Sequence, residues 1–295
     1  MNLKNLTYML FLSFLVPNYL QAQVVREKCL TSNDSDDRYA TYSPDGSQIL
    51  FESIRNGNWD IYVMEADGSN PTPLTTNASE DRRPSWHPDG KKILFESNRN
   101  GEFELFEILL PTGKIESLNA EIKGQEPYFA RYSPNGNFIA LSLKKGEVAE
   151  VCYMKTNGTD LVYLTNFGFR TFFPQWSSDA KSILFQSRFE TNNEDDEIYM
   201  MQLDGSEITR LTTWPTHNFC PSLSNKGDRI AYATSMKDSR PEIYVASADG
   251  SNPLRITNNA EGETLPTWSP TDSKLLVTAY RNGNYEICEI SLENF

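Results

Sequence analysis

A short pattern of a large apolar residue, a serine or histidine and a turn recurs about every 45 residues, and it limits the possible folds more than any other feature. The second residue of each copy lies 44, 46, 44, 47 and 45 residues beyond the previous one, at Ser43, His87, Ser133, Ser177, Ser224 and Ser269. A period of this length with several short strands per unit is typical of a β-propeller. Six such units use nearly all of the chain after residue 22, so we expect an all-β, six-bladed β-propeller that forms one domain over residues 23–295.

We expect four antiparallel strands in each blade, and the first unit shows why. Its innermost strand ends at Tyr42 before a Ser-Pro-Asp-Gly turn, and apolar strands follow at 49–51 and 60–64. An Asp-Gly pair at 67–68 then predicts a tight hairpin, because both central positions of such a turn need a positive φ. A fourth strand ends at 74–75. The other units carry similar signals, so each is expected to form one blade.

The sixth unit is incomplete, because the chain ends at Phe295 just after its third strand. The missing outer strand has a counterpart at the other end of the sequence. Residues 29–36 resemble residues 73–80, and Leu30 lies 44 residues before Leu74, in phase with the repeat. We therefore expect the N-terminal strand to complete the last blade, which removes the free strand edges that an open array would expose.

Two of the four cysteines are expected to meet at this closure. The register of a two-residue hairpin pairs Tyr62 with Pro73, and by alignment Cys288 and Cys29 occupy the matching positions of the last blade. Cross-strand partners lie within disulfide distance, and an oxidising compartment would allow the bond. The alternative is a pair of reduced core cysteines, because a register slip of one residue would separate them. The other two cysteines fall in different blades and are expected to stay free.

Residues 1–22 have the pattern of an export signal. Lys4 precedes an apolar stretch at 6–16, Pro17 breaks that stretch, and Ala22 offers a small residue for cleavage. The apolar stretch is too short to span a bilayer as a helix. We expect a periplasmic or secreted protein without membrane insertion.

The charge of the chain limits the classes of partner. Asp and Glu number 40 against 27 Lys and Arg, for a net charge of −13. Nucleic-acid binding needs a basic surface, and anionic lipid would repel such a chain, so neither partner is expected. A basic protein or a cation fits the charge better, although solubility alone is an alternative explanation for it. We expect a monomer.

The two faces of a propeller have different roles. The first and third loops of each blade share one face, which here carries the repetitive turns and is best interpreted as structural. The second loops and the connections between blades share the other face and vary in sequence, as expected of a binding face. It would form a polar mouth that holds a peptide tail, a sugar or a cation, and the alternative is a solvated loop face. The candidate residues are Asp36, Asp37, Arg38, Glu80, Asp81, Arg82, Arg83, Glu126, Tyr128, Arg170, Phe172, His217, Phe219, Glu261 and Glu263.

An acidic residue opens every third strand, and its periodicity marks it as part of the framework. We expect it to pair with a nearby arginine (Arg55, Arg99 or Arg281) or with backbone N–H groups between blades. The six acidic positions are Asp60, Glu104, Glu150, Glu197, Glu242 and Glu286.

Catalytic and metal-binding signatures are missing from the sequence. The only histidines are His87, in a turn, and His217, on the candidate face, and no zinc-peptidase, serine-hydrolase or Cys-x-x-Cys motif is present. The acidic loop at 190–197 offers oxygen ligands for Ca²⁺ but lacks the Asp-x-Asp-x-Asp-Gly spacing. A Ca²⁺ site there is chemically possible, but a solvated acidic loop is the better interpretation, and we expect no cofactor and no enzyme activity. A glycosidase needs only two placed carboxylates, and the spacing selects no such pair.

Residues 86–95 (Trp-His-Pro-Asp-Gly-Lys-Lys-Ile-Leu-Phe) and 97–106 (Ser-Asn-Arg-Asn-Gly-Glu-Phe-Glu-Leu-Phe) resemble the WD-like repeats of the TolB propeller. The resemblance covers essentially the whole chain after the leader, and implies six blades and an exported, non-catalytic, protein-binding role. This chain differs from TolB because we expect no α/β domain before its propeller. A Tol–Pal role therefore does not carry over directly. The propeller of prolyl-oligopeptidase-type peptidases is also similar, but no hydrolase domain follows here.

Two hypotheses of function follow. The first is a protein- or peptide-binding module in the cell envelope that acts through the variable face. The second is a carbohydrate-active enzyme or a glycan-binding propeller that uses the carboxylates and aromatic residues of the rim.

Overall fold

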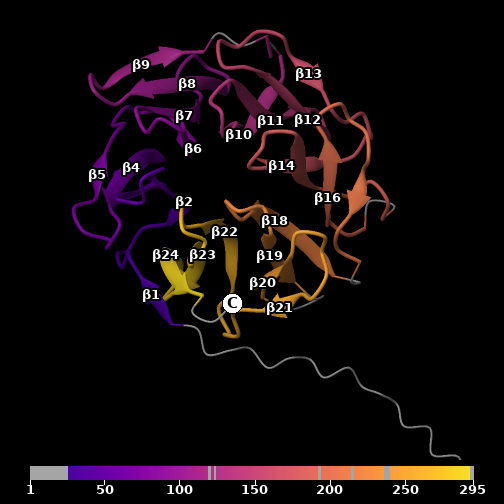
Figure 1. The fold of residues 1–295 in the computed structure, drawn as a ribbon. Helices are drawn as coiled ribbons and strands as arrows, with labels where there is room; N and C mark the ends of the chain where they lie inside the picture. The colour runs from indigo at the N-terminus through magenta and orange to yellow at the C-terminus, as the bar shows by residue number, and fades with distance from the viewer. Residues whose placement is uncertain are drawn as a thin grey trace, which may run out of the picture.

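The computed structural model describes residues 26–118, 121–122, 124–191, 194–213, 216–235 and 240–292, and the predicted export signal at 1–22 lies outside them. The described residues form strands and turns, with no helix, in six four-stranded antiparallel sheets arranged around a central axis (Figure 1). The prediction of a six-bladed β-propeller with four antiparallel strands per blade is confirmed. No helix within the described ranges is long and apolar enough to cross a membrane.

Each blade contributes one strand to each of four layers, counted outward from the axis. The innermost strands are β2 (Asp37–Tyr42), β6 (Asp81–Trp86), β10 (Glu126–Tyr132), β14 (Thr171–Trp176), β18 (His217–Leu223) and β22 (Glu263–Trp268). The second strands are β3 (Gln48–Ser53), β7 (Lys92–Ser97), β11 (Phe138–Lys145), β15 (Ser182–Ser187), β19 (Arg229–Ser235) and β23 (Lys274–Arg281). The third strands are β4 (Asp60–Glu65), β8 (Glu104–Leu109), β12 (Val148–Lys155), β16 (Glu197–Gln202), β20 (Glu242–Ser247) and β24 (Asn284–Ser291). The outermost strands are β5 (Thr72–Pro73), β9 (Lys114–Ser117), β13 (Val162–Tyr163), β17 (Thr209–Arg210), β21 (Leu254–Arg255) and β1 (Glu27–Cys29).

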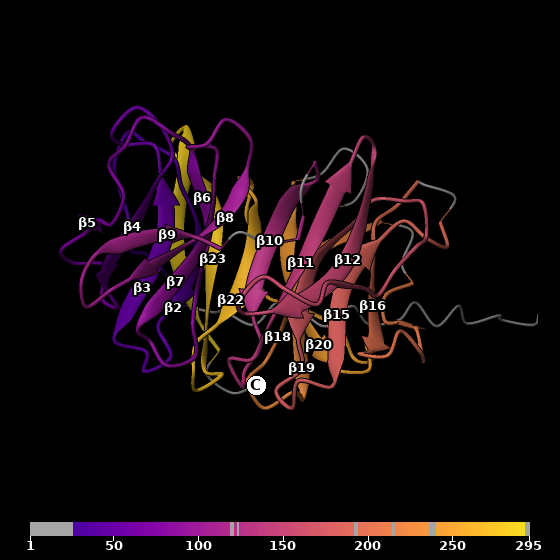
Figure 2. The same cartoon turned by 90° about the horizontal axis from the view of Figure 1, so that it is seen from above.

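The hydrophobic core is divided among the spaces between neighbouring blades. In one such space Leu50 and Ile61 of the first blade pack with Trp86, Ile93 and Phe95 of the second, and all five are buried. The second and third strands are apolar on both faces because each blade lies between two others. Figure 2, turned by 90°, shows these strands running between the two faces of the ring. No blade can therefore cover its own apolar surface without its neighbours.

The N-terminal strand completes the last blade, as predicted. Strand β1 pairs antiparallel with β24 (Figure 1). In this register Cys29 faces Cys288. The same position of the first blade pairs Tyr62 with Pro73. The two sulfur atoms lie at bonding distance, 1.95 Å apart, and the Cα atoms are 3.8 Å apart. The disulfide spans 259 residues of sequence and joins the two ends of the ring. The remaining cysteines, Cys152 and Cys220, are free and buried.

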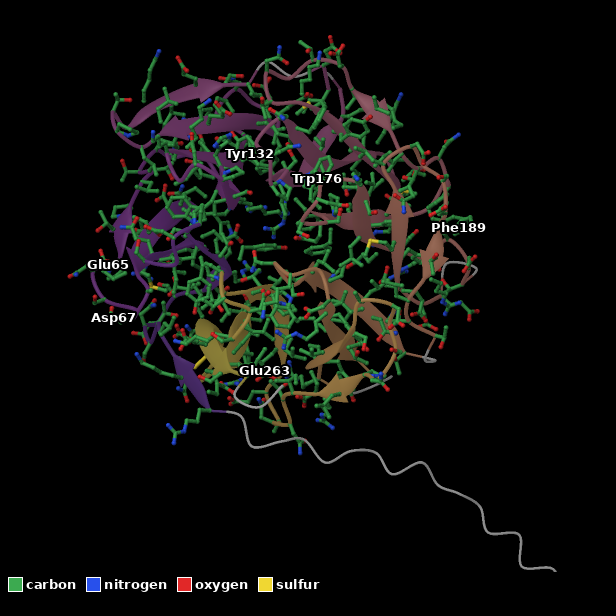
Figure 3. All side chains as sticks on the ribbon, viewed as in Figure 1. Glu65, Asp67, Tyr132, Trp176, Phe189 and Glu263 are labelled. Atoms are coloured by element: carbon green, nitrogen blue, oxygen red, sulfur yellow. A yellow bond between two sulfur atoms is a disulfide. The ribbon has the colours of Figure 1, made fainter. Side chains whose placement is uncertain are left out.

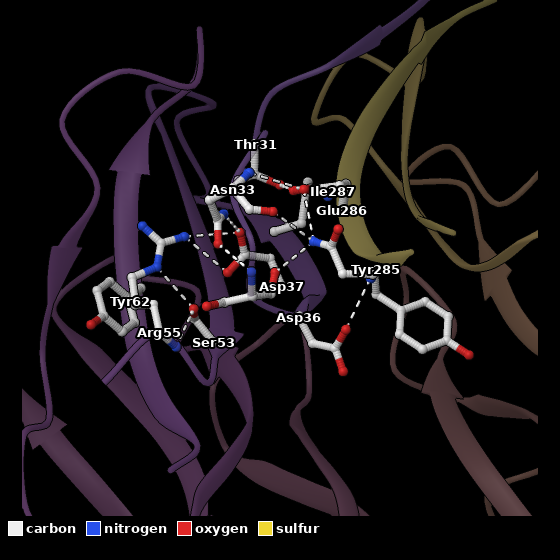
Figure 4. Close-up of polar contacts among 12 residues, drawn as sticks. Thr31, Asn33, Asp36, Asp37, Ser53, Arg55, Tyr62, Tyr285, Glu286 and Ile287 are labelled. Carbon is white, nitrogen blue, oxygen red and sulfur yellow. Dashed lines mark hydrogen bonds and ion pairs between the residues drawn. The ribbon is translucent and has the colours of Figure 1, made fainter. Parts of the chain in front are cut away.

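Buried hydrogen bonds also join the N-terminal segment to the last blade, at the seam where the ring closes. The Thr31 hydroxyl donates to Glu286 Oε2 at 2.5 Å and accepts from the Ile287 amide at 2.9 Å (Figure 4). Thr75 makes the equivalent contacts with Asp60 and Ile61 within the first blade. The matching contacts show that the N-terminal strand takes the place of an ordinary outer strand.

The expected partner of the periodic acid was wrong in one respect. Five of the acids that open the third strands, all except Glu104, accept a hydrogen bond from a threonine just after the outer strand, as Glu150 does from Thr165. Glu150 and Glu286 also accept hydrogen bonds from backbone amides, and Glu197 and Glu242 pair with Arg210 and Arg255 of the outer strands.

The three arginines that were expected as partners instead reach inward. Arg55 Nη2 lies 2.8 Å from Asp37 Oδ2, at the start of the innermost strand (Figure 4). Arg99 pairs in the same way with Asp81, and Arg281 with Glu263. The reason is geometric, because the second loop returns past the start of the innermost strand of its own blade.

We predict that the disulfide contributes to stability mainly by restricting the unfolded chain. Replacing Cys29 and Cys288 by serine should lower the free energy of unfolding by about 2–5 kcal/mol, because the loop that it closes is very long. Urea denaturation monitored by tryptophan fluorescence measures this difference. Reductant should destabilise the native protein but not the double variant, and equal stability of oxidised and reduced native protein would contradict the prediction.

Candidate binding site at the mouth of the central channel

All six innermost strands contain a β-bulge near the variable face, where the strand register shifts by one residue. A residue with a positive φ, between 49° and 57°, lies in each bulge. Such a conformation is unfavourable for residues other than glycine and persists where the surrounding structure holds it. The six bulged residues follow the period of the repeat and are Tyr39, Arg83, Phe129, Phe173, Cys220 and Leu265.

The bulged side chains meet across the ring and narrow the channel. Phe129 and Phe173, from neighbouring blades, stack with ring centroids 3.7 Å apart. Tyr39, two blades away from Phe129, lies 6.0 Å from it. Figure 3 shows side chains reaching from the inner strands into the centre of the ring. The cavity left beside Arg131 and Cys220 has room for about one water molecule. The side chains therefore leave little free space at this level of the channel.

Side chains of the preceding blade hold several of the bulges in place. The Arg83 amide donates to Glu52 Oε2 at 2.7 Å, and the Phe129 amide donates to Glu96 Oε1 at 2.6 Å. The Cys220 amide donates to Gln186 Oε1 at 2.8 Å. These bonds satisfy buried backbone donors that the bulge removes from the ladder. They also tie each blade to the next beside the channel.

Two buried acids and two arginines balance their charges beneath the mouth. Glu52 and Glu96 are buried, and Arg83 forms an ion pair with Glu96. Burial raises the pKa of Glu96 to about 7, although Arg83 opposes the rise, and burial also raises the pKa of Glu52. Burial lowers the pKa of Arg131, whose Nε atom has no hydrogen-bond partner within the described residues. The other blades have small or neutral residues at the position of Arg131: Thr41, Ser85, Gln175, Ser222 and Thr267.

Part of the predicted binding face belongs to the framework. Asp37, Asp81 and Glu263 are fully buried in ion pairs with second-loop arginines. Phe172 is also buried, and Phe219 packs against a hydrophobic core cluster. Arg83 belongs to the buried charge cluster. These residues support the mouth rather than present groups to a ligand.

The other predicted residues lie at the surface. Arg82 pairs with Glu80 at 2.8 Å and lies over the Phe103 ring. Burial and the neighbouring Glu126 raise the pKa of Tyr128 to about 12. Arg170 is exposed and lies over the Phe172 ring at 5.4 Å. Asp36 accepts a hydrogen bond from the Tyr285 amide at 3.0 Å (Figure 4).

The fourth blade brings an acidic segment close to the predicted His217. The His217 Nε2 atom lies 3.5 Å from Asp195 Oδ1. The next residue, Asp196, forms an ion pair with Arg188. Residues 192–193 of this loop lie outside the described ranges. Among the residues that the structure describes, the only cluster of potential metal ligands is Glu27, Cys29 and Cys288, and the disulfide occupies its sulfur atoms.

Several residues of the mouth were absent from the prediction. Arg240, Tyr280 and Tyr285 line a pocket of about 160 Å³ together with the predicted Arg38 and Glu261. Lys144 lies 5.7 Å from the Tyr128 ring. These residues belong to second loops and to the ends of the strands beside them, and the prediction took its candidates from the connections between blades. Counting the charged and aromatic residues of both kinds of loop would have identified them.

Comparison with known proteins agrees with this architecture. The model of the family described as the TolB beta propeller domain matches residues 2–194 and 166–294. An uncharacterized protein of Agrobacterium fabrum (strain C58) is 31% identical over 150 residues, which are 50% of this chain and 49% of that relative. The chain therefore aligns with about half the length of that relative.

Solved structures share the fold at low sequence identity. A putative TolB from Agrobacterium tumefaciens has a TM-score of 0.72 and 18% identity, covering 88% of this chain and 98% of that one. An oligogalacturonate lyase in complex with manganese has a TM-score of 0.66 and 13% identity, covering 92% and 94%. Such identities show the fold alone.

We predict that Asp81 acts on stability and its neighbour Glu80 does not. Replacing Asp81 by alanine removes the partner of Arg99 from a buried site, and should lower the free energy of unfolding by about 3 kcal/mol. The control Glu80→Ala breaks a surface pair and should cost no more than about 1 kcal/mol. Equal effects in urea denaturation would contradict the framework role of Asp81.

We predict a pH dependence of stability that originates in Glu96. Because its pKa is raised from an ordinary 4.5 to about 7 in the folded protein, the native state holds a proton that the unfolded state has lost. Stability should therefore fall as the pH rises from about 4.5 through 7, by up to about 3 kcal/mol from this group.

Replacing Glu96 by glutamine keeps a hydrogen-bonding group and should flatten this part of the profile. Urea denaturation at a series of pH values measures it. The matched control is Glu65→Gln at an exposed strand end, which should leave the profile unchanged. The same slope in Glu96→Gln as in the native protein would refute the assignment.

Proposed function

This chain belongs to the TolB beta propeller domain family, and we propose that it is an exported, non-catalytic module that binds a protein or peptide in the cell envelope. The bound segment would lie on the mouth, by which we mean the surface around the channel on the face of the second loops. The export pattern at residues 1–22 and the disulfide at the seam support an oxidising, extracytoplasmic location.

The main support is the kind of side chain that gathers at the mouth. Exposed or half-buried cations there lie over aromatic rings and are held in place by them, although the chain as a whole carries a net charge of −13. Arginine and aromatic residues are enriched at protein interfaces and dominate their energetics. The cations of the mouth are Arg38, Arg82, Lys144, Arg170 and Arg240.

The narrowed channel supports a surface mode of binding. Aromatic side chains from three blades close the centre just below the mouth, so a partner would rest on a floor of rings instead of entering a pore. Burial of such rings gives a large gain in free energy at a small cost in side-chain entropy.

The glycan hypothesis has less support. Two of the carboxylates that it would use, Asp81 and Glu263, are fully buried and paired with arginine. A third, Glu80, pairs with Arg82. A general acid and base need free access to the glycosidic oxygen and to water. We therefore keep the binding module as the proposal, although enzymes share this fold.

Affinity capture tests the proposal. The immobilised protein should capture the same envelope protein or peptide reproducibly from envelope extracts of its source cells. A double variant, Arg82→Gln with Arg170→Gln, should reduce capture at least about tenfold, because charge-assisted contacts at an interface centre are lost. Arg83 is left intact because it supports the buried cluster.

The matched control removes the same charge from the opposite face. Lys91→Gln with Lys181→Gln changes two exposed lysines beside the repetitive turns and should leave capture unchanged. Equal loss in both double variants, or no reproducible capture combined with turnover of a glycan, would overturn the proposal.

A further inference from the structure

One pocket at the mouth is lined by residues of the fifth, sixth and first blades. It has the features of an anion site. Its volume is about 160 Å³, much larger than that of the cavity beside Arg131, so it can admit a small ionic group. Arg38 comes from the first blade, and Arg240 from the start of the third strand of the fifth. Tyr280 and Tyr285 come from the sixth blade, which lies between the fifth and the first in the closed ring. Two cations thus converge on one small cavity.

Aromatic rings hold both arginines in place. The Arg38 guanidinium carbon lies 4.0 Å from the Trp59 ring centroid and 5.4 Å from that of Tyr285. The Arg240 guanidinium carbon lies 5.7 Å from the Tyr280 ring. The two tyrosine rings contact each other edge to face, 5.3 Å apart. Rings of this kind attract the cation through their faces and leave its N–H donors at the edge.

Within the described part of the chain, the donors of both arginines are largely unused. Arg38 Nε is buried and has no hydrogen-bond partner in the described part of the chain. Its nearest acid, Asp36, lies 4.0 Å away and already accepts a hydrogen bond from the Tyr285 amide. Among the described residues Arg240 forms no ion pair within 4.0 Å. A buried donor without a partner is costly, so an acceptor in this pocket would be stabilised.

A glycine brings the second cation to the pocket. At Gly262, where φ is +89°, a Cβ atom would lie 3.1 Å from Arg240 Cβ and 3.1 Å from Pro241 Cδ. Any other residue would push these atoms away. The close approach lets the start of β20 rest against the connection into the sixth blade, with the arginine at the rim.

We propose that this pocket, named here the Arg38–Arg240 pocket, binds a carboxylate group of an acidic peptide segment. The proposal rests on the function proposed above and specifies the chemistry of its partner. Guanidinium groups match the geometry of carboxylates and phosphates. The Glu261 carboxylate also lines the pocket, but it lies 3.9 Å from Arg281, so the two pocket arginines leave the site suited to an anion. Because the proposed partner is a protein or peptide, the anion is taken to be a carboxylate. The carboxylate can come from a chain terminus or from an Asp or Glu side chain.

Three fluorescent peptides of one uncharged sequence test this chemistry. The first has a free C-terminus, the second a C-terminal amide, and the third an amide with one internal glutamate. Fluorescence anisotropy with the purified protein, at an ionic strength of about 0.05 M, measures binding. The first or the third should bind, depending on the source of the carboxylate, and the second should bind at least about tenfold more weakly.

Substitutions locate the binding. Arg240→Gln and Arg38→Gln should each weaken carboxylate binding about tenfold or more, whereas the turn-face control Lys91→Gln with Lys181→Gln should not. Because Arg38 also packs on Trp59, Arg38→Lys serves as a second variant that keeps the charge and loses the two-point contact. Thermal melting checks that all variants fold.

The outcomes separate this proposal from the broader one. Equal binding of the amidated neutral peptide, or carboxylate binding that survives both arginine substitutions, would overturn the pocket. If an envelope partner is captured and depends on Arg82 and Arg170 but not on Arg38 and Arg240, the pocket is wrong and the binding module stands. If carboxylate peptides bind as expected but no envelope partner is captured and a glycan is turned over, the pocket stands and the proposed function is wrong.

Discussion

The joining of the first and last blades is the constraint on which the rest of the structure depends. Every blade is apolar on both faces, so each is covered only when two neighbours are in place. An open array would leave two such faces and two strand edges in water. Strand β1 closes the array because it pairs with β24 of the last blade, and the chain then continues directly into the first blade. The seam reproduces an ordinary outer-strand contact, in which Thr31 replaces Thr75, and adds a covalent bond.

The six bulges place a second requirement on the inner strands. A regular strand would alternate its side chains, but the bulge adds a residue with positive φ that points into the channel. The backbone amide released by the bulge needs an acceptor, and Glu52, Glu96 or Gln186 of the preceding blade supplies it. The buried carboxylates then require Arg83 and Arg131 nearby to balance their charge. The floor of the mouth is thus a consequence of how the strands are packed.

The sequence predicted the parts of the fold that depend on local signals. The Asp-Gly turn determined the hairpin register, which correctly paired Tyr62 with Pro73, and the repeat phase located the closing strand. The pairing of Arg55 was wrong because Asp60 is much nearer to it in sequence than Asp37, which is 18 residues away, yet the return of the loop places Arg55 beside Asp37. The residues that fill the channel were missed because a bulge interrupts the inward and outward alternation of side chains along the strand. Sequence reasoning infers the direction of each side chain from that alternation. Tyr39 and Arg131 therefore carried no signal of their location in a single sequence.

The surroundings of each arginine distinguish framework from candidate site. Arg55, Arg99 and Arg281 hold carboxylates that are fully buried, so their charge is used within the fold. Arg38 and Arg240 lie instead over neutral rings, which position a guanidinium without occupying its hydrogen-bond donors. An acidic protein that needed cations only for its fold would gain more from pairing them with its abundant acids. Arginines held by tyrosine and tryptophan at the edge of a pocket are better suited to a group that arrives from outside. An acceptor anion satisfies donors that the described residues leave unused.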